Sequence, residues 1–414
     1  MLIERTLLKS SLDEWNSFFK RARAKLHQRP VTFQLPTENM ALALTGVRRC
    51  GKTYQSINAT LSIPEEEILY YNFEDSIFYQ SPDVQNLSLL LSVAEEYSNS
   101  KIQFLILDEI QNVDGWERWL RALIDQKRYK IIVTGSSAKL LSSEIATSLT
   151  GRCIEKKLWP LSFKEKLSFY NSDTLLINEF RQYLTWGGMP EIVLTQDEEI
   201  KKDILKQYLN DIVHKDVVNR HEIRNKRALD QILVYYLTNI ASMHSYTALH
   251  KAFHITAETA AEYTAALQNA YLIFEVSRYH QNLKVQSRDS KKIYCVDPGF
   301  RLAGSRTIHD DTARLLENIV FIELQRRKCE VFYFKEKNEV DFIVTKQYQA
   351  IEAIQVCYDL SDQKTRKREL AGLIEAMDSL GLHRGIIITF NQEEKINVEN
   401  YKIDCIPITT WLCS

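Results

Sequence analysis

The sequence contains the stretch Thr45-Gly46-Val47-Arg48-Arg49-Cys50-Gly51-Lys52-Thr53, which fits the pattern G-x-x-x-x-G-K-[ST] and follows the apolar run Met40-Ala41-Leu42-Ala43-Leu44. The apolar run predicts a buried strand, and a helix is expected to begin at Gly51. Glycine permits the tight backbone path that points successive N–H groups at phosphate oxygens, and the helix dipole adds positive potential there. The stretch therefore predicts a P-loop that binds a nucleotide.

Each polar group of this loop has an expected partner on ATP or Mg²⁺. Lys52 is expected to bring its charge to the β- and γ-phosphates, and the Thr53 hydroxyl is expected to bind Mg²⁺. The expected nucleotide contacts come from Gly46, Arg49, Cys50, Gly51, Lys52 and Thr53. The implied cofactors are therefore ATP and Mg²⁺.

Length and composition describe an ordinary soluble protein of several domains. The 414 residues suffice for about two to four domains, and 45% hydrophobic with 26% charged residues is typical of globular chains. A net charge of −1 gives no overall attraction to nucleic acid or anionic lipid, so such binding would need a local patch. Charged residues near the amino terminus argue against a signal peptide, and no apolar run reaches about eighteen residues. The seven cysteines are scattered, as in proteins of a reducing compartment. We therefore expect a cytoplasmic protein without a membrane segment.

Four apolar runs separated by helical stretches predict a parallel sheet covered on both faces, which is an α/β fold. The expected strands are residues 40–45, 68–73, 102–107 and 130–134. Because the carboxyl ends of parallel strands meet at one edge of the sheet, ligands bind there. The polar residues that follow these strands are Gly46, Glu74-Asp75, Asp108-Glu109 and Gly135-Ser136-Ser137.

The run Leu105-Ile106-Leu107-Asp108-Glu109 ends in two carboxylates downstream of the P-loop. This pattern predicts that Asp108 binds Mg²⁺ through water and that Glu109 polarises the attacking water. The plain alternative is a strand end with two solvated acids.

Ser136 and Arg152 each have two interpretations. Ser136, in Thr134-Gly135-Ser136-Ser137, either senses the γ-phosphate or belongs to an ordinary polar loop. Arg152, in Thr150-Gly151-Arg152, is either an arginine finger that acts on a neighbouring subunit or part of a surface salt bridge. A finger acting in trans would require at least a dimer.

These motifs resemble those of a group of prokaryotic AAA+ ATPases with an uncharacterised carboxy-terminal region that contains a restriction-endonuclease-like fold. The resemblance covers nearly the whole chain. It implies ATP binding and hydrolysis, and it does not name a substrate. The residues that carry it are Gly46–Thr53, Leu107–Gln111, Thr134–Ser137, Leu149–Arg152, Pro160–Phe163, Trp186-Gly187-Gly188-Met189-Pro190-Glu191 and Val296-Asp297-Pro298-Gly299-Phe300.

The first half of the chain divides into three expected regions. Residues 1–35 carry an N-terminal helix, about 12–26, whose basic side chains either are solvated or meet phosphates. Residues 36–164 form the AAA+ P-loop core. The apolar pattern of residues 165–225 predicts helices that are interrupted at Gly187-Gly188-Met189-Pro190. The resemblance implies that these helices form a lid that closes over nucleotide.

Residues 226–297 predict a winged helix. Apolar residues from Leu229 to Ile240 follow helical spacing, further helices are expected at 247–253 and 257–269, and strands at 271–279 and 291–296. The helix at 257–269 contains two acids, Glu258 and Glu262, and no lysine or arginine, which favours a protein-facing role over DNA contact. DNA contact stays an alternative because basic residues lie nearby, at Arg220, Arg224, Lys226, Arg227, Arg288, Lys291 and Lys292.

In residues 298–414 the sequence pattern predicts helices and strands in the order α-β-β-β-α-β, which matches the endonuclease-like core. The expected elements are a helix at 312–328, strands at 330–335, 339–345 and 350–358, a helix at 361–380 and a strand at 385–390. Glu317 and Asp341 stand where two metal-binding acids are expected, but Gln355-Val356-Cys357 replaces the acid-x-lysine pair. Because cysteine lacks an ammonium group, we expect a degenerate site that serves as a scaffold rather than a nuclease.

Three functions agree with these motifs. The first is a Mg²⁺-dependent ATPase that couples its nucleotide state to carboxy-terminal domains that bind DNA or protein. The second is a nucleotide-dependent switch that binds a protein partner without hydrolysis, and the third is an ATP-regulated DNA nuclease. The implied partners are ATP or ADP, DNA or another protein, and a second copy of the chain.

Overall fold

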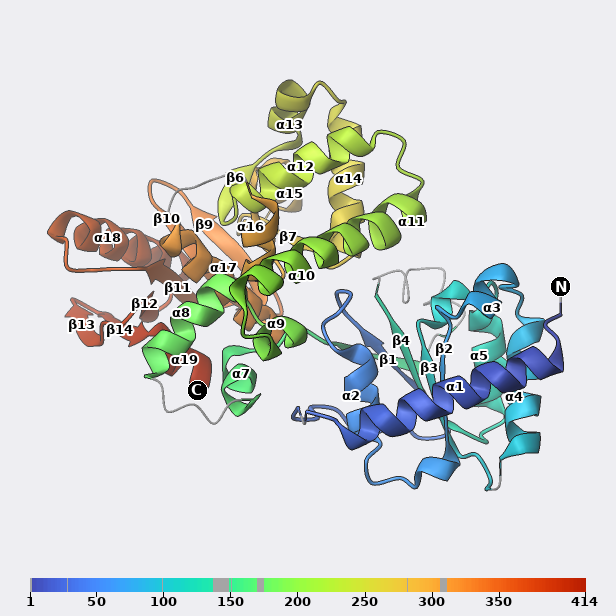
Figure 1. Ribbon diagram of the computed structural model, residues 1–414. Helices are drawn as coiled ribbons and strands as arrows, with labels where there is room; N and C mark the ends of the chain where they lie inside the picture. The colour runs from blue at the N-terminus through green and yellow to red at the C-terminus, as the bar shows by residue number, and fades with distance from the viewer. Residues whose placement is uncertain are drawn as a thin grey trace. The chain divides into compact units, whose positions relative to one another are not determined.

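The computed structural model describes residues 2–27, 29–98, 100–136, 149, 151–169, 175–280, 282–305 and 311–414. The chain divides into two compact units (Figure 1). The first consists of Met1–Leu158 with Asn269–Tyr271, and the second of Trp159–Gln268 with Leu272–Ser414. Every helix among the described residues is too short or too polar to span a lipid bilayer.

The first unit is built on a five-stranded sheet in which all strands are parallel, in the order β2-β3-β4-β1-β5. The strands are β1 (Ala41–Thr45), β2 (Ile68–Asn72), β3 (Phe104–Asp108), β4 (Lys130–Gly135) and β5 (Cys153–Lys157). The four strands predicted from apolar runs are confirmed. Strand β5 has no such run, because it forms an exposed edge of the sheet and ends in Glu155, Lys156 and Lys157.

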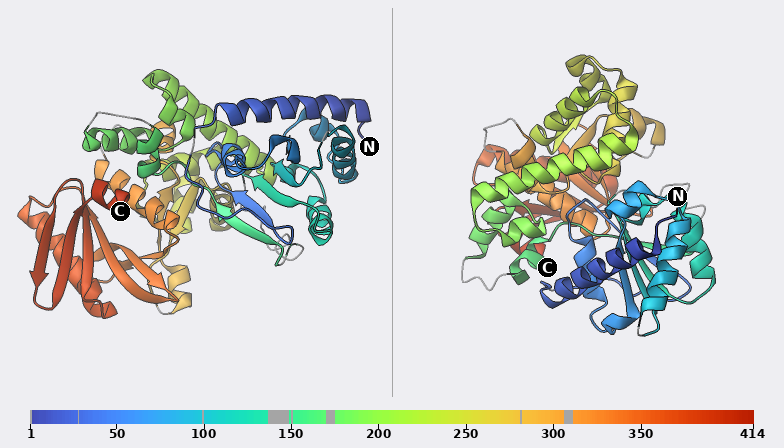
Figure 2. Two further views of the ribbon diagram at one scale, coloured as in Figure 1. Left: turned by 90° about the horizontal axis from the view of Figure 1, so that it is seen from below. Right: turned by 45° about the vertical axis from the view of Figure 1, so that its right-hand side comes forward.

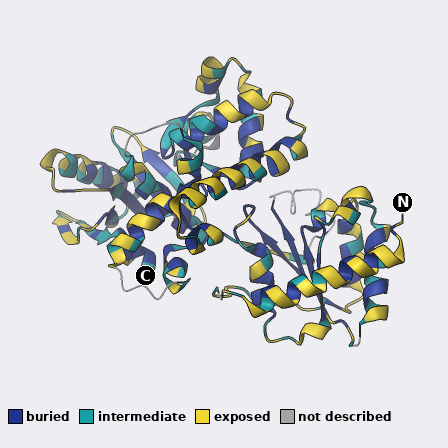
Figure 3. Ribbon diagram, in the orientation of Figure 1, coloured by how far each residue is buried: buried dark blue, intermediate teal, exposed yellow. Residues whose placement is uncertain are grey.

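Helices cover both faces of this sheet. The side chains of Ala41 and Ala43 pack into one hydrophobic core and those of Leu42 and Leu44 into another, because successive side chains of a strand point to opposite faces. Figure 3 shows the strands buried and the outer faces of the helices exposed. The helical elements are α1 (Arg5–Ala24), α2 (Lys52–Ala59), η1 (Glu65–Glu67), α3 (Ser76–Gln80), α4 (Gln85–Tyr97), η2 (Ile110–Asn112) and α5 (Trp116–Asp125).

Helix α1 packs along the edge strand β2 and begins at Arg5, earlier than the predicted start near residue 12. The Trp15 ring centroid lies 6.0 Å from that of Tyr70 and 6.2 Å from that of Tyr71. The helix therefore shields an edge that would otherwise offer unpaired backbone groups to another strand.

One basic residue of α1 has a structural role. The guanidinium of Arg23 donates hydrogen bonds to the carbonyl oxygens of Thr60, Leu61 and Ile63, at 3.1, 2.7 and 2.8 Å. These carbonyl groups lie at and just beyond the C-terminus of α2, where helix carbonyls lack intrahelical partners. Arg23 therefore ties α1 to the end of the P-loop helix instead of being solvated.

The second unit opens with helices on either side of the predicted break at Gly187–Pro190, which is confirmed. The helices are α7 (Phe163–Phe169), α8 (Leu176–Trp186), α9 (Pro190–Leu194), α10 (Glu198–Asp211), the π-helix η4 (Ile212–Val218) and α11 (Asn219–His221). Although expected as a lid on the P-loop core, residues 165–225 belong to the second compact unit. Their role as a lid stays a prediction.

Residues 226–297 form three main helices and a three-stranded antiparallel sheet in the order β6-β8-β7. The elements are α12 (Lys226–Thr238), β6 (Ser242–His244), α13 (Tyr246–Phe253), α14 (Ala257–Asn269), β7 (Ile273–Val276), α15 (Leu283–Arg288) and β8 (Lys291–Cys295). The predicted helices and the strand at 291–296 are confirmed. Strand β7 is shorter than predicted, and the short elements β6 and α15 carry too few residues to show a periodic pattern.

A six-stranded mixed sheet dominates the end of the chain, in the order β13-β14-β12-β11-β10-β9 (Figure 2). Strands β11, β12 and β14 are parallel to one another, and the remaining pairs are antiparallel. The predicted α-β-β-β-α-β order is confirmed, and a hairpin and a last helix extend it. The elements are α16 (Pro298–Gly304), α17 (Thr312–Arg326), β9 (Glu330–Lys335), β10 (Glu339–Lys346), β11 (Gln349–Cys357), α18 (Gln363–Leu380), β12 (Arg384–Thr389), β13 (Glu394–Val398), β14 (Tyr401–Pro407) and α19 (Ile408–Cys413).

A buried carboxylate joins two glycine-containing motifs within the second unit. Oδ2 of Asp297 accepts a hydrogen bond from the N–H of Gly188 at 2.7 Å, and Oδ1 accepts one from Gly299 at 2.9 Å. A Cβ atom on Gly187 would lie 1.7 Å from Oδ1 of Asp297, and one on Gly188 would lie 2.0 Å from the carbonyl oxygen of Leu161. The two motifs therefore form one joint in which the backbone approaches too closely for side chains.

The substitution Gly188→Ala tests this joint. Because the new methyl group would overlap the Leu161 carbonyl, we expect the second unit to lose about 3 kcal/mol of unfolding free energy. Denaturant unfolding measures the loss. The control is Gly381→Ala, whose Cβ meets nothing within 4 Å and whose φ of 67° costs only about 1–2 kcal/mol. Equal losses for both variants would contradict the steric explanation.

Candidate functional site

The P-loop connects β1 to α2 along a path that requires glycine. Gly46 and Gly51 have positive φ angles of 144° and 97°. A Cβ atom on Gly46 would lie 2.1 Å from the carbonyl oxygen of Leu158. Helix α2 begins at Lys52, so the N–H groups of its first turn, which lack intrahelical partners, lie at the loop. The loop therefore has the backbone geometry of an anion-binding turn.

Lys52 and Thr53 are held by hydrogen bonds that a bound phosphate and metal ion can replace. Nζ of Lys52 donates to the carbonyl oxygens of Gly46 and Val47 at 3.2 and 3.3 Å. Oγ1 of Thr53 donates to Oδ2 of Asp108 at 2.7 Å. The structure thus brings the loop together with the end of β3, as the sequence predicts.

Asp108 is buried at the end of β3, where four side chains donate hydrogen bonds to it. Besides Thr53, the hydroxyl of Tyr70 donates to Oδ2 at 3.0 Å and the amide of Asn72 at 3.3 Å. The Thr134 hydroxyl donates to Oδ1. These donors come from β2, β4 and α2, so the neighbouring strands fix the orientation of this carboxylate.

Glu109 follows Asp108 in the left-handed backbone conformation, with φ of 54°, which is uncommon for a residue other than glycine. Its N–H donates to Oγ1 of Thr134 at 3.2 Å. Its Oε1 lies 3.7 Å from Nζ of Lys52, and its Oε2 accepts a hydrogen bond from Nε2 of Gln111. Burial and the neighbouring Glu109 carboxylate raise the pKa of Asp108.

Ser136 and Arg152 lie at opposite ends of the sheet. Ser136 is buried directly after β4, at the edge that carries the P-loop. The carbonyl of Arg152 instead accepts a hydrogen bond from the N–H of Ala41, at the start of β1, and its side chain forms a 2.8 Å ion pair with Asp125. Since β1 spans about 13 Å between Ala41 and Thr45, Arg152 lies far from the P-loop of its own chain. Ser137 and Thr150 lie outside the described residues.

Sequence reasoning missed several polar side chains of this site. Arg48 is buried, and its guanidinium lies 2.6 Å from a carboxylate oxygen of Glu74. Thr134 donates a hydrogen bond to Asp108 and accepts one from the N–H of Glu109. A signal was present for both, because Arg48 lies within the P-loop pattern and Thr134 ends a buried strand.

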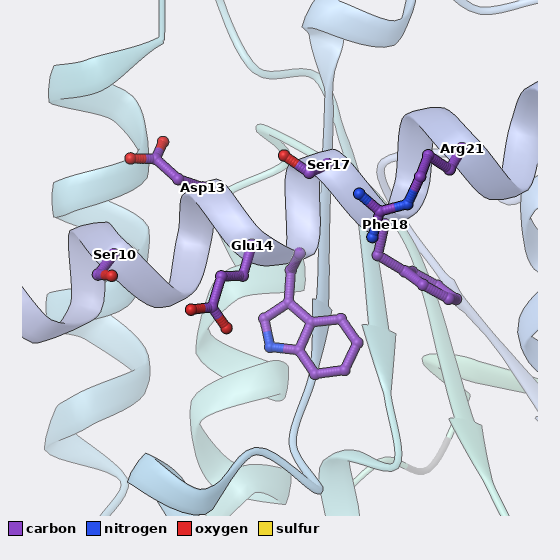
Figure 4. Close-up of a pocket in the computed structure, with 7 residues that line it drawn as sticks. Ser10, Asp13, Glu14, Ser17, Phe18 and Arg21 are labelled. Atoms are coloured by element: carbon purple, nitrogen blue, oxygen red, sulfur yellow. The ribbon is translucent and has the colours of Figure 1, made fainter.

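A separate hollow lies along α1, with a volume of about 590 Å³ (Figure 4). The residues that Figure 4 labels around it are Ser10, Asp13, Glu14, Ser17, Phe18 and Arg21. None of its lining residues belongs to the P-loop or to the end of β3. The hollow is therefore separate from the P-loop.

The predicted carboxylates of the carboxy-terminal region meet around a lysine that the sequence analysis assigned elsewhere. Nζ of Lys292, on β8, lies 2.9 Å from Oε1 of Glu317 and 2.8 Å from Oδ1 of Asp341. Burial lowers the pKa of Lys292, but Asp341 and Glu317 raise it more, so it lies well above its usual value. Gln355 bonds to other groups: its Oε1 accepts the N–H of Asp341 at 3.1 Å, and its Nε2 donates to Glu369 at 2.7 Å.

Comparison with known proteins gives the family of the chain. The uncharacterized protein MJ1544 of Methanocaldococcus jannaschii is 36% identical over 415 residues, which cover 94% of this chain and 91% of that protein. This chain belongs to the same family. An uncharacterized protein of Haemophilus influenzae is 32% identical over 383 residues, which cover 89% of this chain and 93% of that protein.

Two protein-family models match parts of this chain. Residues 38–167 match an AAA domain, and residues 177–308 match a domain of unknown function, DUF8612. The first match spans the five-stranded sheet and the P-loop, so this part of the chain is similar to AAA domains.

Solved structures show weaker similarity. DnaA from Aquifex aeolicus bound to AMPPCP is 13% identical with a TM-score of 0.29, covering 65% of this chain and 89% of that chain. The Aeropyrum pernix Orc1 protein in complex with DNA is 10% identical with a TM-score of 0.31, covering 77% and 94%. Similarity of this degree supports no argument about the ligands of this chain.

The substitution Asp108→Asn separates stability from function at this site. Two adjacent carboxylates are buried here, so removing one charge should stabilise the fold. We expect the free energy of unfolding of the nucleotide-free variant to exceed that of wild type by about 1 kcal/mol. Denaturant unfolding in EDTA measures the difference, with the exposed Asp13→Asn as control. A less stable Asp108→Asn variant would show that the four donated hydrogen bonds outweigh the burial of charge.

Proposed function

We propose that this chain binds ATP together with Mg²⁺ at the P-loop and hydrolyses the γ-phosphate. One observation carries the proposal: Lys52, Thr53, Asp108 and Glu109 converge at the carboxyl ends of β1 and β3, beside the first turn of α2. The ends of parallel strands are where such folds bind ligands, and a helix N-terminus adds positive potential.

The residues present fit a Mg²⁺ ion. The Thr53 hydroxyl and the Asp108 carboxylate lie 2.7 Å apart, and both are oxygen ligands of the kind that Mg²⁺ prefers. When bound, Mg²⁺ neutralises charge that develops on the transferring phosphoryl group. Lys52 is hydrogen-bonded to two neutral carbonyl oxygens, so a charged phosphate oxygen is a stronger acceptor for its ammonium.

Hydrolysis requires a residue that orients water, and we assign that role to Glu109. Its backbone is fixed by Thr134 and its carboxylate by Gln111, so the carboxylate is held in one orientation before substrate binds. Ser136 is buried at the same edge of the sheet and is assigned to the γ-phosphate. Arg152 can only serve a P-loop in another copy of the chain, because its own P-loop lies at the far end of β1.

The carboxy-terminal regions are assigned the output of the nucleotide cycle. We retain the regions 1–35, 36–164, 165–225, 226–297 and 298–414 as proposed domains, with residues 226–297 as a winged helix. Its helix α14 carries Glu258 and Glu262 and no lysine or arginine, which favours a protein partner over DNA. The competing proposal is a switch that binds ATP and a partner without hydrolysis.

Two substitutions test the nucleotide site. We expect Lys52→Ala to weaken ATP affinity at least about tenfold, because it removes a charge-assisted contact to phosphate. We expect Glu109→Gln to keep the affinity and to lower turnover about 10²–10⁴-fold. Calorimetry with ATP and Mg²⁺ measures affinity and phosphate release measures turnover, with the exposed Lys20→Ala as control. If wild type does not bind ATP, the proposal is wrong. If wild type binds ATP without hydrolysing it, the result supports the competing proposal of a nucleotide-dependent switch.

A third substitution tests whether Gln111 positions Glu109. We expect Gln111→Ala to lower kcat about tenfold and to leave KM for ATP unchanged, because Glu109 loses its fixed orientation. Steady-state phosphate release measures both constants. An increase in kcat would mean that Gln111 holds Glu109 away from the attacking water.

A further inference from the structure

The carboxylate cluster of the second unit is organised around a buried ammonium group. Lys292 is 2% exposed, and its Nζ lies 2.9 Å from Oε1 of Glu317, 2.9 Å from Oε1 of Glu339 and 2.8 Å from Oδ1 of Asp341. An ammonium group has three N–H donors, so each donor has one carboxylate. The lysine thus lies at the centre of three acids that come from α17 and β10.

Two of these carboxylates accept further hydrogen bonds. Oδ2 of Asp341 accepts the N–H of Val356 at 3.0 Å, and the Tyr294 hydroxyl donates to Oε1 of Glu317 at 2.7 Å. Among the described residues, no group of three or more histidine, cysteine, aspartate or glutamate side chains has an arrangement that could hold a metal ion. The endonuclease-like order of elements implies a divalent metal ion here, but acids that already surround the Lys292 ammonium do not fit one.

The position next to the cluster also departs from a metal site. Gln355 uses both ends of its amide on protein groups, the N–H of Asp341 and the carboxylate of Glu369. Sγ of Cys357, where an ammonium would be expected, donates to the carbonyl of Asp359 at 3.3 Å. An ammonium group is therefore present in this cluster, but Lys292 supplies it. This ammonium lies between the acids, where a metal ion would lie in a nuclease.

From this arrangement we infer that the Lys292 ammonium is the resident cation of the cluster and takes the place of a divalent metal ion. Its function is to fasten β8 to α17 and β10, which joins residues 226–297 to the last sheet through one charged contact. A divalent ion and the ammonium cannot share three carboxylates, because two cations about 3 Å apart in a buried site repel each other strongly. The inference is independent of the nucleotide site.

The variant Lys292→Met removes the charge and keeps most of the side-chain volume. In EDTA we expect its unfolding midpoint to fall by roughly 10 °C, because three carboxylates lose their shared cation. We expect about 1 mM Mn²⁺ to raise the unfolding midpoint of the variant part of the way back and to leave the wild-type midpoint unchanged. Differential scanning calorimetry of the nucleotide-free protein measures both effects, and isothermal titration with Mn²⁺ reports binding directly.

Matched variants keep the experiment decisive. Lys335→Met, at an exposed lysine beside Glu339, is the control and should behave as wild type. Wild type that binds Mn²⁺ with a signal that Asp341→Ala abolishes would overturn the inference, as would a Lys292→Met variant as stable as wild type in EDTA. If Lys292→Met does not fold, Glu317→Gln replaces it: a lower midpoint in EDTA without a Mn²⁺ response supports the inference, and an unchanged midpoint contradicts it.

Discussion

All five strands of the P-loop sheet run in the same direction, and the rest of the candidate site depends on this constraint. It places the end of β1 beside the end of β4 and the end of β3 beside that of β2. Residues far apart in the chain, such as Thr53, Tyr70 and Thr134, can therefore donate hydrogen bonds to one carboxylate, that of Asp108. The same constraint removes Arg152 from the site, because it precedes its strand instead of following it.

Two buried lysines show how the number and charge of the acceptors decide what an ammonium group can do. Lys52 donates to two neutral carbonyl oxygens at 3.2 and 3.3 Å and lies 3.7 Å from one carboxylate, that of Glu109, within a loop whose backbone donors are suited to an anion. Lys292 is bonded to three carboxylates at 2.8 to 2.9 Å. An arriving phosphate offers Lys52 a better acceptor, but nothing of comparable strength competes for Lys292. One lysine is thus suited to exchange partners and the other to hold them.

Much of the fold could be predicted from local patterns, and the exceptions have physical causes. Strands β1 to β4 are buried on both faces and leave continuous apolar runs, whereas the edge strand β5 is mostly polar and leaves none. The P-loop, Asp108 and Glu109 are recognisable because their spacing within one turn or one strand end fixes their geometry. Lys292 was not assigned to its cluster, because its partners Glu317 and Asp341 follow it by 25 and 49 residues and meet it only through tertiary packing.

The hydrogen bonds of Arg23 make the N-terminal helix part of the support of the P-loop helix α2. A chain that began at residue 36 would keep every recognisable motif of the P-loop sheet, yet the carbonyl groups of Thr60, Leu61 and Ile63 would lose their guanidinium donor. The far end of the helix that presents Lys52 and Thr53 would then fray more readily. Domain boundaries drawn from motifs alone would therefore cut through the support of helix α2, and the smallest autonomous fragment with the P-loop should include α1.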